Sequence, residues 1–347
     1  MLKSLENVYF AFDHEITVST DCDDKDIIKE LYAVVSIFNL NTYKRLPLIK
    51  AVLQPNDKGC PNRITHHYYH ALSHMVNTQH RESPYLIVFE DDLELGKDVL
   101  HYFYAHRELL EKENPENKQS KESSIWCISA WNDHGYIHTA QNETKSYRID
   151  GWPGLGWMTK SALVRKELLP NWPLHAGADW DMWLRTDYTR NGRVCIVPDI
   201  SRTYHFGESG KNVDQNWQEL YFIRHKLYNP VLSKKANPVP KTLNFKPIID
   251  LTKNVYDKNL EEVIKNGVRI EESTVCGDKV EFDFDSKTTY VLRIDEQVSQ
   301  DENLKIFSCL RIWDLDIRGL YMGVLRIHYN RAPLIVLFCN INVRFCK

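Results

Sequence analysis

The stretch from Tyr85 to Asp92 reads YLIVFEDD, five apolar or aromatic residues followed directly by three acids. A short apolar run of this kind is typical of a buried strand in a parallel sheet. In open α/β sheets, ligands gather at the carboxyl ends of the strands, where adjacent carboxylates suit a hard divalent cation shared with phosphate oxygens. Glu90-Asp91-Asp92 is therefore a candidate metal motif, and a solvated acidic loop is the alternative.

The segments on either side alternate between strand and helix patterns. Apolar residues recur at helical spacing from Ile64 to Gln79 and again from Val99 to Leu110. Ile16-Thr17-Val18 and Ser124–Ser129 are short β-rich runs, and Pro153–Trp157 predicts a tight turn leading into a helix through about residue 169. The chain is therefore expected to adopt an α/β fold.

The last third of the chain differs in composition. The stretch from Asn229 to Pro247 carries four prolines and predicts a connection between residues 1–228 and 248–347. Beyond it we expect a helix near Thr252–Asn266 and strands at Lys279–Phe284 and Thr289–Leu292. Residues 248–347 should thus form a small strand-rich region.

Bulk composition excludes several classes of protein. With 347 residues, 43% of them hydrophobic, the chain is long enough for one large or two medium domains. A net charge of -3 gives no general attraction to nucleic acid or to anionic membranes. No apolar run is long enough to cross a membrane, and the start does not resemble a signal peptide. Eight cysteines without zinc spacing, and the sequon Asn142-Glu143-Thr144, are compatible with a secretory compartment.

A second acidic pair, Asp179 and Asp181, lies beside Trp180 and Trp183. Neighbouring indoles reduce the hydration of a carboxylate, so its pKa should rise towards the range of a general base, and indole faces can stack on sugar rings. The alternative is a half-buried helix whose tryptophans belong to the core.

Histidines provide weaker signals. His205 follows the apolar run Val194–Val197 and could complete a metal shell, although a hydrogen-bonded structural histidine is the commoner case. The four histidines 66, 67, 70 and 74 share one face of the expected helix, which we interpret as mostly surface, with one histidine reaching a ligand.

Four longer segments resemble the family that contains N-acetylglucosaminyltransferase I. They are Cys127–Asp133 (CISAWND), Trp152–Met158 (WPGLGWM), Trp180–Trp183 (WDMW) and Pro198–Gly207 (PDISRTYHFG). The resemblance covers nearly the whole chain. It implies a GT-A type mixed sheet flanked by helices and an inverting transfer of N-acetylglucosamine from UDP-GlcNAc to the 2-hydroxyl of a mannose.

Within that family, three features resemble the members that act on O-linked mannose of proteins. They are the Asp179–Trp183 form DWDMW, the ending Tyr204–Gly207 and the later segment Cys309–Gly319. The expected partners are therefore UDP-GlcNAc and an O-mannosylated protein. The alternatives are an enzyme acting on N-glycan mannose and an inactive sugar-binding homologue. A metal hydrolase is disfavoured because no second ligand cluster has suitable spacing.

The resemblance also implies roles for single residues. Asp92 is expected to hold Mn²⁺ with His205 near it, and Asp181 to be the catalytic base. Further candidates are Asp21, His67, Glu90, Asp91, Lys211 and Asn212 for the donor, and Trp131, Asn132, Trp180 and Trp183 for the sugars. The implied disulfides are Cys127 with Cys195 and Cys276 with Cys309, and no partner is implied for Cys22, Cys60, Cys339 and Cys346.

Three parts of the family pattern are absent from this sequence. They are the first strand with its nucleotide-binding loop, the stem domain and the membrane anchor. Met1–Leu5 resembles the helix that follows that strand. We therefore expect a fragment of a longer type II membrane protein whose catalytic part faces the Golgi lumen, and a degenerate paralogue is the alternative. An inactive chain is compatible with both, because loss of the first strand would remove contacts with the donor.

Overall fold

The structure is a computed structural model that describes residues 1–8, 11, 15–21, 25–42, 48–50, 62–112, 124–175, 177–208, 213–228, 248–277, 282–295, 299–341 and 344–346. The α-helices are α1 Leu2–Leu5, α2 Lys25–Thr42, α3 Asn62–His74, α4 Val99–Lys112, α5 Ser161–Leu163, α6 Trp180–Arg185, α7 Asp187–Arg190, α8 Gln215–Trp217, α9 Lys253–Asn266, α10 Ser273–Cys276 and α11 Gln300–Leu310. The strands are β1 Val18–Thr20, β2 Leu48–Lys50, β3 Tyr85–Val88, β4 Leu93–Leu95, β5 Ile125–Ser129, β6 Ser146–Ile149, β7 Trp157–Lys160, β8 Val194–Pro198, β9 Thr203–His205, β10 Val268–Ile270, β11 Tyr290–Ile294, β12 Val324–Tyr329 and β13 Ala332–Phe338. Short 3₁₀ and π turns are η2 Met75–Gln79, η3 Val164–Leu168, η4 Leu169–Asn171, η5 Gln218–Phe222, η6 Ile248–Leu251 and η7 Arg344–Cys346.

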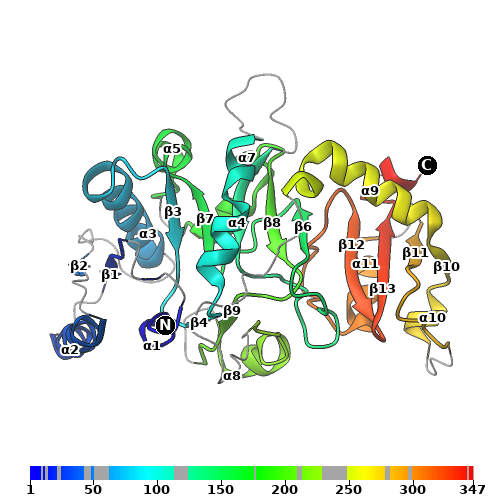
Figure 1. Cartoon of the computed structure of the whole chain (residues 1–347), viewed down its shortest axis with the longest axis horizontal. Coiled ribbons are helices and arrows are strands. Elements are labelled where there is room, and N and C mark those ends of the chain that lie inside the picture. The colour runs from blue at the N-terminus through cyan, green and yellow to red at the C-terminus, as the bar shows by residue number, and fades with distance from the viewer. Residues whose placement is uncertain are drawn as a thin grey trace, which may run out of the picture.

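The central sheet has five strands in the order β3-β7-β5-β8-β6 (Figure 1). β5 and β8 run parallel, whereas β7 is antiparallel to β3 and β5, and β6 is antiparallel to β8. The expected α/β architecture with a mixed sheet is thus confirmed. β3 itself pairs with an antiparallel neighbour and not, as expected, within a parallel set.

Helices cover both faces of this sheet. Ile128 and Met158 pack with residues of α4, such as Phe103, on one side. Their neighbours Cys127 and Trp157 point to the other side, where they join the cluster that contains Leu72 and Val76 of the α3 segment. Successive side chains of a strand alternate between faces, so each of these strands contributes to two cores.

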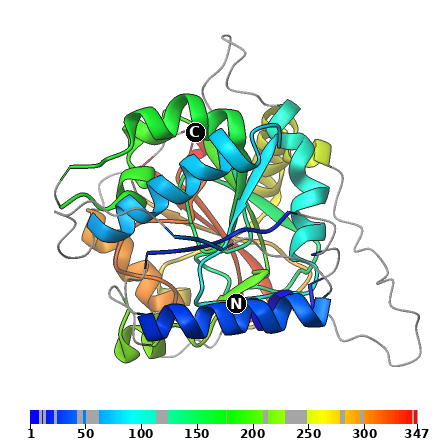
Figure 2. The same ribbon diagram turned by 90° about the vertical axis from the view of Figure 1, so that its left-hand side faces the viewer.

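Two smaller units lie beside the central sheet. β1 pairs in parallel with β2, and Figure 2, seen from that side, shows α3 crossing in front of the central strands and α2 along the bottom of the view. β4 pairs antiparallel with β9, so that Leu93, next to the acidic triplet, faces His205 in register. This second pairing brings two distant motifs together.

The C-terminal region forms a separate four-stranded sheet in the order β10-β11-β13-β12, beside β6 in Figure 1. β13 is its most apolar strand, and residues such as Val336 and Leu337 are almost fully buried. Leu337 and Ile335 belong to the same hydrophobic cluster as Ile128 of β5, so the two sheets share one core. The strand-rich character expected for residues 248–347 is confirmed.

The helical patterns of the sequence are found close to their expected positions. α3 with η2 covers Asn62–Gln79, α4 covers Val99–Lys112 and α9 covers Lys253–Asn266. In the described part of the chain, no helix combines the length and the apolar character that a membrane crossing requires.

One sequence expectation was wrong at the Pro153–Trp157 turn. Gly154, Leu155 and Gly156 do form a sharp turn, with φ values of 69°, 46° and 94°. A Cβ at Gly156 would lie 2.8 Å from Thr203 Cγ2, so only glycine fits there. The turn leads into strand β7 before the helical segment begins at Ser161, because Trp157–Lys160 fills the position between β3 and β5.

The strand expected at Lys279–Phe284 is not found in the described part of that segment. Phe282–Phe284 lies outside any strand, and residues 278–281 lie outside the described residues. Phe284 instead packs edge-on against Tyr290 at the start of β11. At Phe282 and Phe284 the alternation corresponds to aromatic packing. A pattern of period two cannot distinguish such packing from strand pairing.

Three disulfides fasten these elements. Cys127–Cys195 joins the neighbouring strands β5 and β8, and Cys276–Cys309 joins α10 to α11, as the resemblance implied. The structure adds Cys339–Cys346 at the chain end, a pairing that the sequence did not indicate. Cys22 and Cys60 lie outside the described residues.

Removing the Cys127–Cys195 bridge should destabilise the fold more than removing Cys339–Cys346. The first bridge joins residues 68 positions apart and the second residues 7 apart. Chain-entropy arguments give losses of about 4 and about 2 kcal/mol, respectively. Urea unfolding of the two double Cys→Ala variants measures the difference. Equal losses in the free energy of unfolding would mean that the entropy of the unfolded chain does not determine how much each bridge stabilises the fold.

Candidate functional site

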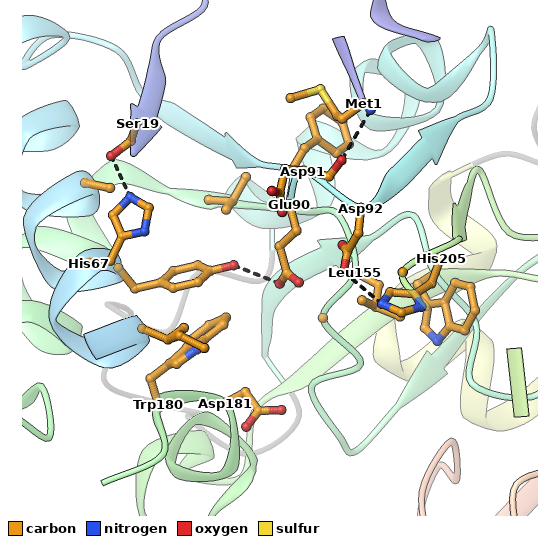
Figure 3. A pocket seen from close by; sticks show the side chains of 18 of the residues that line it. Met1, Ser19, His67, Glu90, Asp91, Asp92, Leu155, Trp180, Asp181 and His205 are labelled. Carbon is orange, nitrogen blue, oxygen red and sulfur yellow. Dashed lines mark hydrogen bonds and ion pairs between the residues drawn. The ribbon is translucent and has the colours of Figure 1, made fainter. Parts of the chain in front are cut away.

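A pocket of about 1060 Å³ opens where β3 ends (Figure 3). Elements far apart in the chain line it: the β1 strand, α3, the acidic triplet, the Pro153–Leu155 turn, α6, β9 and the segment that follows α11. Of the residues singled out in the sequence, its lining includes Asp21, His67, Glu90, Asp91, Asp92, Trp131, Trp180, Asp181 and His205. The acidic triplet, the Asp-Trp-Asp motif and His205 therefore face one cavity.

The three acids after β3 have different surroundings. Glu90 Oε1 accepts a hydrogen bond from Tyr68 Oη at 2.8 Å. Burial, followed by the charge of Asp92, raises the pKa of Glu90 to about 7. Asp91 is exposed, and its backbone oxygen accepts a bond of 3.3 Å from the Met1 amine. The triplet is thus not a uniform solvated loop.

Asp92 forms a close pair with His205. The distance from Asp92 Oδ2 to His205 Nε2 is 3.0 Å. On the other side of the ring, Gln218 Nε2 donates to the His205 backbone oxygen at 2.8 Å, which turns Gln218 Oε1 towards Nδ1 at 3.1 Å. Because Oε1 can only accept, Nδ1 carries a hydrogen. In the neutral ring Nε2 therefore keeps the lone pair that a cation could use, whereas in the protonated ring Nε2–H donates to Asp92.

This pair fits one side of a metal shell. Two adjacent ligands of an octahedral ion, with bonds of about 2.1 Å, lie about 3.0 Å apart, as Asp92 and His205 do. Asp92 Oδ1 is buried without a hydrogen-bond partner among the described residues. A Cβ at Gly207 would lie 2.8 Å from Asp92 Oδ2, so glycine keeps the space beside the pair open. The donor set therefore suits a hard divalent cation.

The protein supplies only part of such a shell. Among the described residues, no group of three His, Cys, Asp or Glu side chains is arranged to hold an ion. Further ligands would have to be oxygen atoms of a substrate or water, which is usual for ions that act on phosphates. Although burial lowers the pKa of His205, its hydrogen bond with Asp92 and the charge of Asp92 outweigh that effect and raise it.

Asp181 lies on another side of the same pocket, on α6 (Figure 3). Arg185, one turn further along the helix, approaches its Oδ2 to 3.4 Å. The charges of Asp181, Asp92 and His205 all act on Glu90, whose carboxyl group lies between them in Figure 3. The two carboxylates that the sequence singled out, Asp92 and Asp181, thus line one pocket, and both act on the same buried group.

Asp179 supports this arrangement from the start of α6. It is the N-cap residue, and its side chain accepts a bond of 3.3 Å from the Asp181 backbone N–H. Burial, followed by a side-chain hydrogen bond with Asp181 and the charge of Asp181, raises the pKa of Asp179 to about 6. The expected upward shift of a carboxyl pKa beside the indoles therefore occurs at Asp179.

Asp179 should make folding stability depend on pH between about 4 and 6. In this range the folded chain binds a proton that the unfolded chain lacks, because the ordinary pKa of the group is 3.8. Stability should therefore fall as the pH rises through the window. Asp179→Asn should remove that slope, since asparagine also caps helices but does not titrate. Chemical unfolding of both proteins across this range is the test, and parallel profiles would refute it.

Aromatic rings form one side of the pocket. Trp180 stacks on Tyr68 with ring centroids 3.6 Å apart, and Trp131 stacks on His225 at 4.1 Å. Trp131 is almost fully buried, so little of its ring is open to a ligand. Asn132 and Trp183 do not belong to the lining formed by the described residues. Asn132 donates to the Asp199 backbone oxygen at 2.9 Å, and Trp183 packs on Trp172.

The nucleotide candidates lie at the β1 end of the pocket. Asp21 accepts a bond of 2.9 Å from Arg63 Nε, and its second oxygen lies 3.9 Å from His67 Nδ1. His67 Nε2 is 2.8 Å from Ser19 Oγ, and burial lowers the pKa of His67, which favours a neutral ring. Lys211 and Asn212, the expected diphosphate loop, lie outside the described residues.

The structure adds pocket residues to which we had given no role. Arg318, from the segment after α11, makes two bonds of 2.5 Å with Asp316 and lies 4.0 Å over the Trp313 ring. Its side chain also approaches Asp133 at 3.8 Å. The segment Cys309–Gly319 had been singled out only as a family motif. Tyr68, which also lines the pocket, and Gln218, which lies outside the lining and contacts His205, carried no functional signal of their own.

Comparison with known proteins identifies relatives of the chain. The sequence model described as GNT-I family matches residues 9–337. The chain is also similar to the alpha-1,3-mannosyl-glycoprotein 2-beta-N-acetylglucosaminyltransferase of Arabidopsis thaliana, with 30% identity over 286 residues. That match covers 82% of this chain and 58% of the relative, so the chain spans a little over half of that relative's length.

Proposed function

The chain belongs to the GNT-I family, and on that premise we propose that it transfers N-acetylglucosamine from UDP-GlcNAc to the 2-hydroxyl of a mannose, with inversion. The observation that supports this most directly is that Asp181 and the Asp92–His205 pair line the same pocket. Inverting transfer requires a group that stabilises the leaving diphosphate on one side of the sugar carbon and a base on the other. Asp92 and Asp181 are suited to these two tasks.

On the leaving-group side, Asp92 and His205 would hold Mn²⁺, the ion implied by the family resemblance. When bound, the ion would neutralise negative charge that grows on the departing diphosphate. The chain contributes the orientation: Gln218 fixes the His205 ring, and Gly207 leaves space beside both ligands. Lys211 and Asn212 remain candidates for contacts with the diphosphate.

On the acceptor side, Asp181 would remove the proton of the attacking hydroxyl. Arg185 at 3.4 Å steadies the carboxylate, and the bond from the Asp181 N–H to Asp179 fixes the start of the helix that carries it. The hydroxyl oxygen then forms the new bond to the anomeric carbon while the bond to the diphosphate breaks. One displacement converts an α-linked donor into a β-linked product.

The other pocket residues would hold the two substrates. Asp21, His67 and Asp91 are candidates for nucleotide contacts, and Glu90 with Trp180 for the transferred sugar. Trp131, Asn132 and Trp183 were also singled out for the sugars. The burial of Trp131 and Asn132 and the packing of Trp183 on Trp172 suit a role in shaping the pocket. We propose one catalytic domain that comprises residues 1–228 and 248–347. The hydrophobic core that the two ranges share supports this proposal.

For the acceptor, we propose the α-1,3-linked mannose of a glycoprotein glycan and not the O-linked mannose that the sequence motifs favoured. The similarity to the Arabidopsis enzyme, whose name specifies that acceptor, supports this choice. We further propose the Golgi lumen as its location, as the family resemblance implies. The three disulfides support a lumenal compartment of the secretory pathway, where such bridges persist.

An acceptor panel tests the proposal. The chain is incubated with radiolabelled UDP-GlcNAc and Mn²⁺, together with an oligomannose glycan or an O-mannosyl peptide. Label on the oligomannose in a β-1,2 linkage is the expected result. Label on the peptide alone would show that the acceptor is O-linked mannose, as the sequence motifs predicted. Binding of UDP without transfer to either acceptor would favour an inactive sugar-binding homologue.

A further inference from the structure

The loop before β6 contains the triplet Asn142-Glu143-Thr144, which the proposed transferase reaction does not use. It is the one sequon in the sequence. Asn142 and Glu143 are exposed, and Thr144 is half-buried. None of the three belongs to the pocket lining. A group attached here would therefore extend into solvent without occupying the substrate pocket.

The triplet adopts a defined turn. Asn142 Oδ1 accepts two hydrogen bonds of 3.0 Å, one from the Thr144 backbone N–H and one from the Thr144 hydroxyl. The first of these bonds closes an Asx turn. Both bonds use the amide oxygen, so the amide nitrogen points away from the turn. Within the described part of the chain, no hydrogen bond engages Asn142 Nδ2.

Buried residues form hydrogen bonds with the backbone of this turn. Asp199, which is almost fully buried, accepts bonds of 2.8 Å from the Gln141 N–H and 2.6 Å from the Asn142 N–H. Its second oxygen accepts from Tyr147 Oη at 3.0 Å, and Arg202 donates to the Glu143 backbone oxygen. The backbone is thus anchored through buried contacts, while the Asn142 side chain remains on the surface.

We propose that Asn142 carries an N-linked oligosaccharide. The donor would be a lipid-pyrophosphate-linked oligosaccharide, used by the oligosaccharyltransferase of the secretory pathway. The bond from Asn142 Nδ2 to the first sugar carbon forms, the bond from that carbon to the pyrophosphate oxygen breaks, and the lipid pyrophosphate leaves. One amide proton passes to a base of the transferring enzyme. The Thr144 hydroxyl, by donating to Oδ1, draws electrons from the amide and favours loss of that proton.

This inference rests on the lumenal location proposed above and not on the transferase reaction. The test uses the full chain behind a cleavable secretory signal, translated with microsomes of the endoplasmic reticulum. Only chains protected from added protease are analysed, because these have entered the lumen. They should carry the mass of one glycan, removable by an N-glycosidase. Asn142→Asp and Thr144→Ala should abolish the modification, whereas Thr144→Ser should keep it.

Asn142→Asp is the matched control, because aspartate retains the turn-forming oxygen and lacks the amide nitrogen. Protected wild-type chains of unmodified mass would overturn the proposal, whether or not the protein transfers N-acetylglucosamine. If the chains were glycosylated but showed no transferase activity, that result would count against the proposed function and not against the glycosylation of Asn142. A second measurement tests exposure: the glycan should be removed from the folded, secreted protein without denaturant and without a change in Tm. A glycan that resists removal until the protein unfolds would contradict the surface position.

Discussion

Replacing Asp181 by asparagine is expected to lower kcat by about a hundred to ten thousand fold, the range that general-base assistance contributes. Asparagine keeps the shape of the side chain and an oxygen that can accept from Arg185, but it cannot take the proton of the acceptor hydroxyl. Asp181 lies on α6 and is not one of the proposed metal ligands, so binding of UDP should persist. Turnover and calorimetric UDP binding, measured on the same preparation, test both expectations.

Asp187→Asn provides the matched control. Asp187 is a strongly exposed carboxylate on the next helix, where it pairs with Arg190, and it is not among the pocket residues. Its substitution should leave kcat unchanged. If Asp181→Asn retained wild-type turnover, Asp181 would not be the base. If it lost UDP binding together with turnover, Asp181 would be a donor contact instead.

Replacing Asp92 by asparagine is expected to abolish the dependence of UDP binding on Mn²⁺ and to lower kcat/KM by at least about a hundredfold. The substitution removes the negative charge that faces His205 Nε2 at 3.0 Å and leaves a neutral amide in its place. Titration of Mn²⁺ by calorimetry, with and without UDP, measures the loss independently of activity.

The control for this substitution is Glu94→Gln. Glu94 lies on β4, two residues after Asp92, where it is exposed and outside the pocket lining. It changes the net charge of the same segment without touching the proposed ligands. An Asp92→Asn protein that binds Mn²⁺ and UDP like the wild type would remove Asp92 from the metal site. Equal losses in Glu94→Gln would indicate a general effect of charge.

The local elements of this fold were readable from the sequence because local patterns encode them. The apolar run Tyr85–Phe89 became β3, and the helical spacing after Ile64 became α3. The strand β7 was missed because four residues that follow a glycine turn carry no period that separates a strand from the start of a helix. Only the pairing of Trp157–Lys160 with β3 and β5 shows that this segment is a strand.

The candidate site also has features that the sequence determined and features that only the tertiary structure decided. The sequence by itself determined which residues are candidates for the proposed chemistry: the acids after β3, the Asp-Trp-Asp motif and His205, each marked by its position beside an apolar run or an indole. Only the tertiary structure decided what surrounds them, since the β4–β9 pairing brings His205 to Asp92, and α3 brings Tyr68 to Glu90. The bond of Gln218 with His205 and the approach of Arg318 to Asp133 likewise join segments that are separated in the chain. A sequence specifies side-chain chemistry and short-range conformation, whereas distances between remote side chains depend on how strands pair and layers pack.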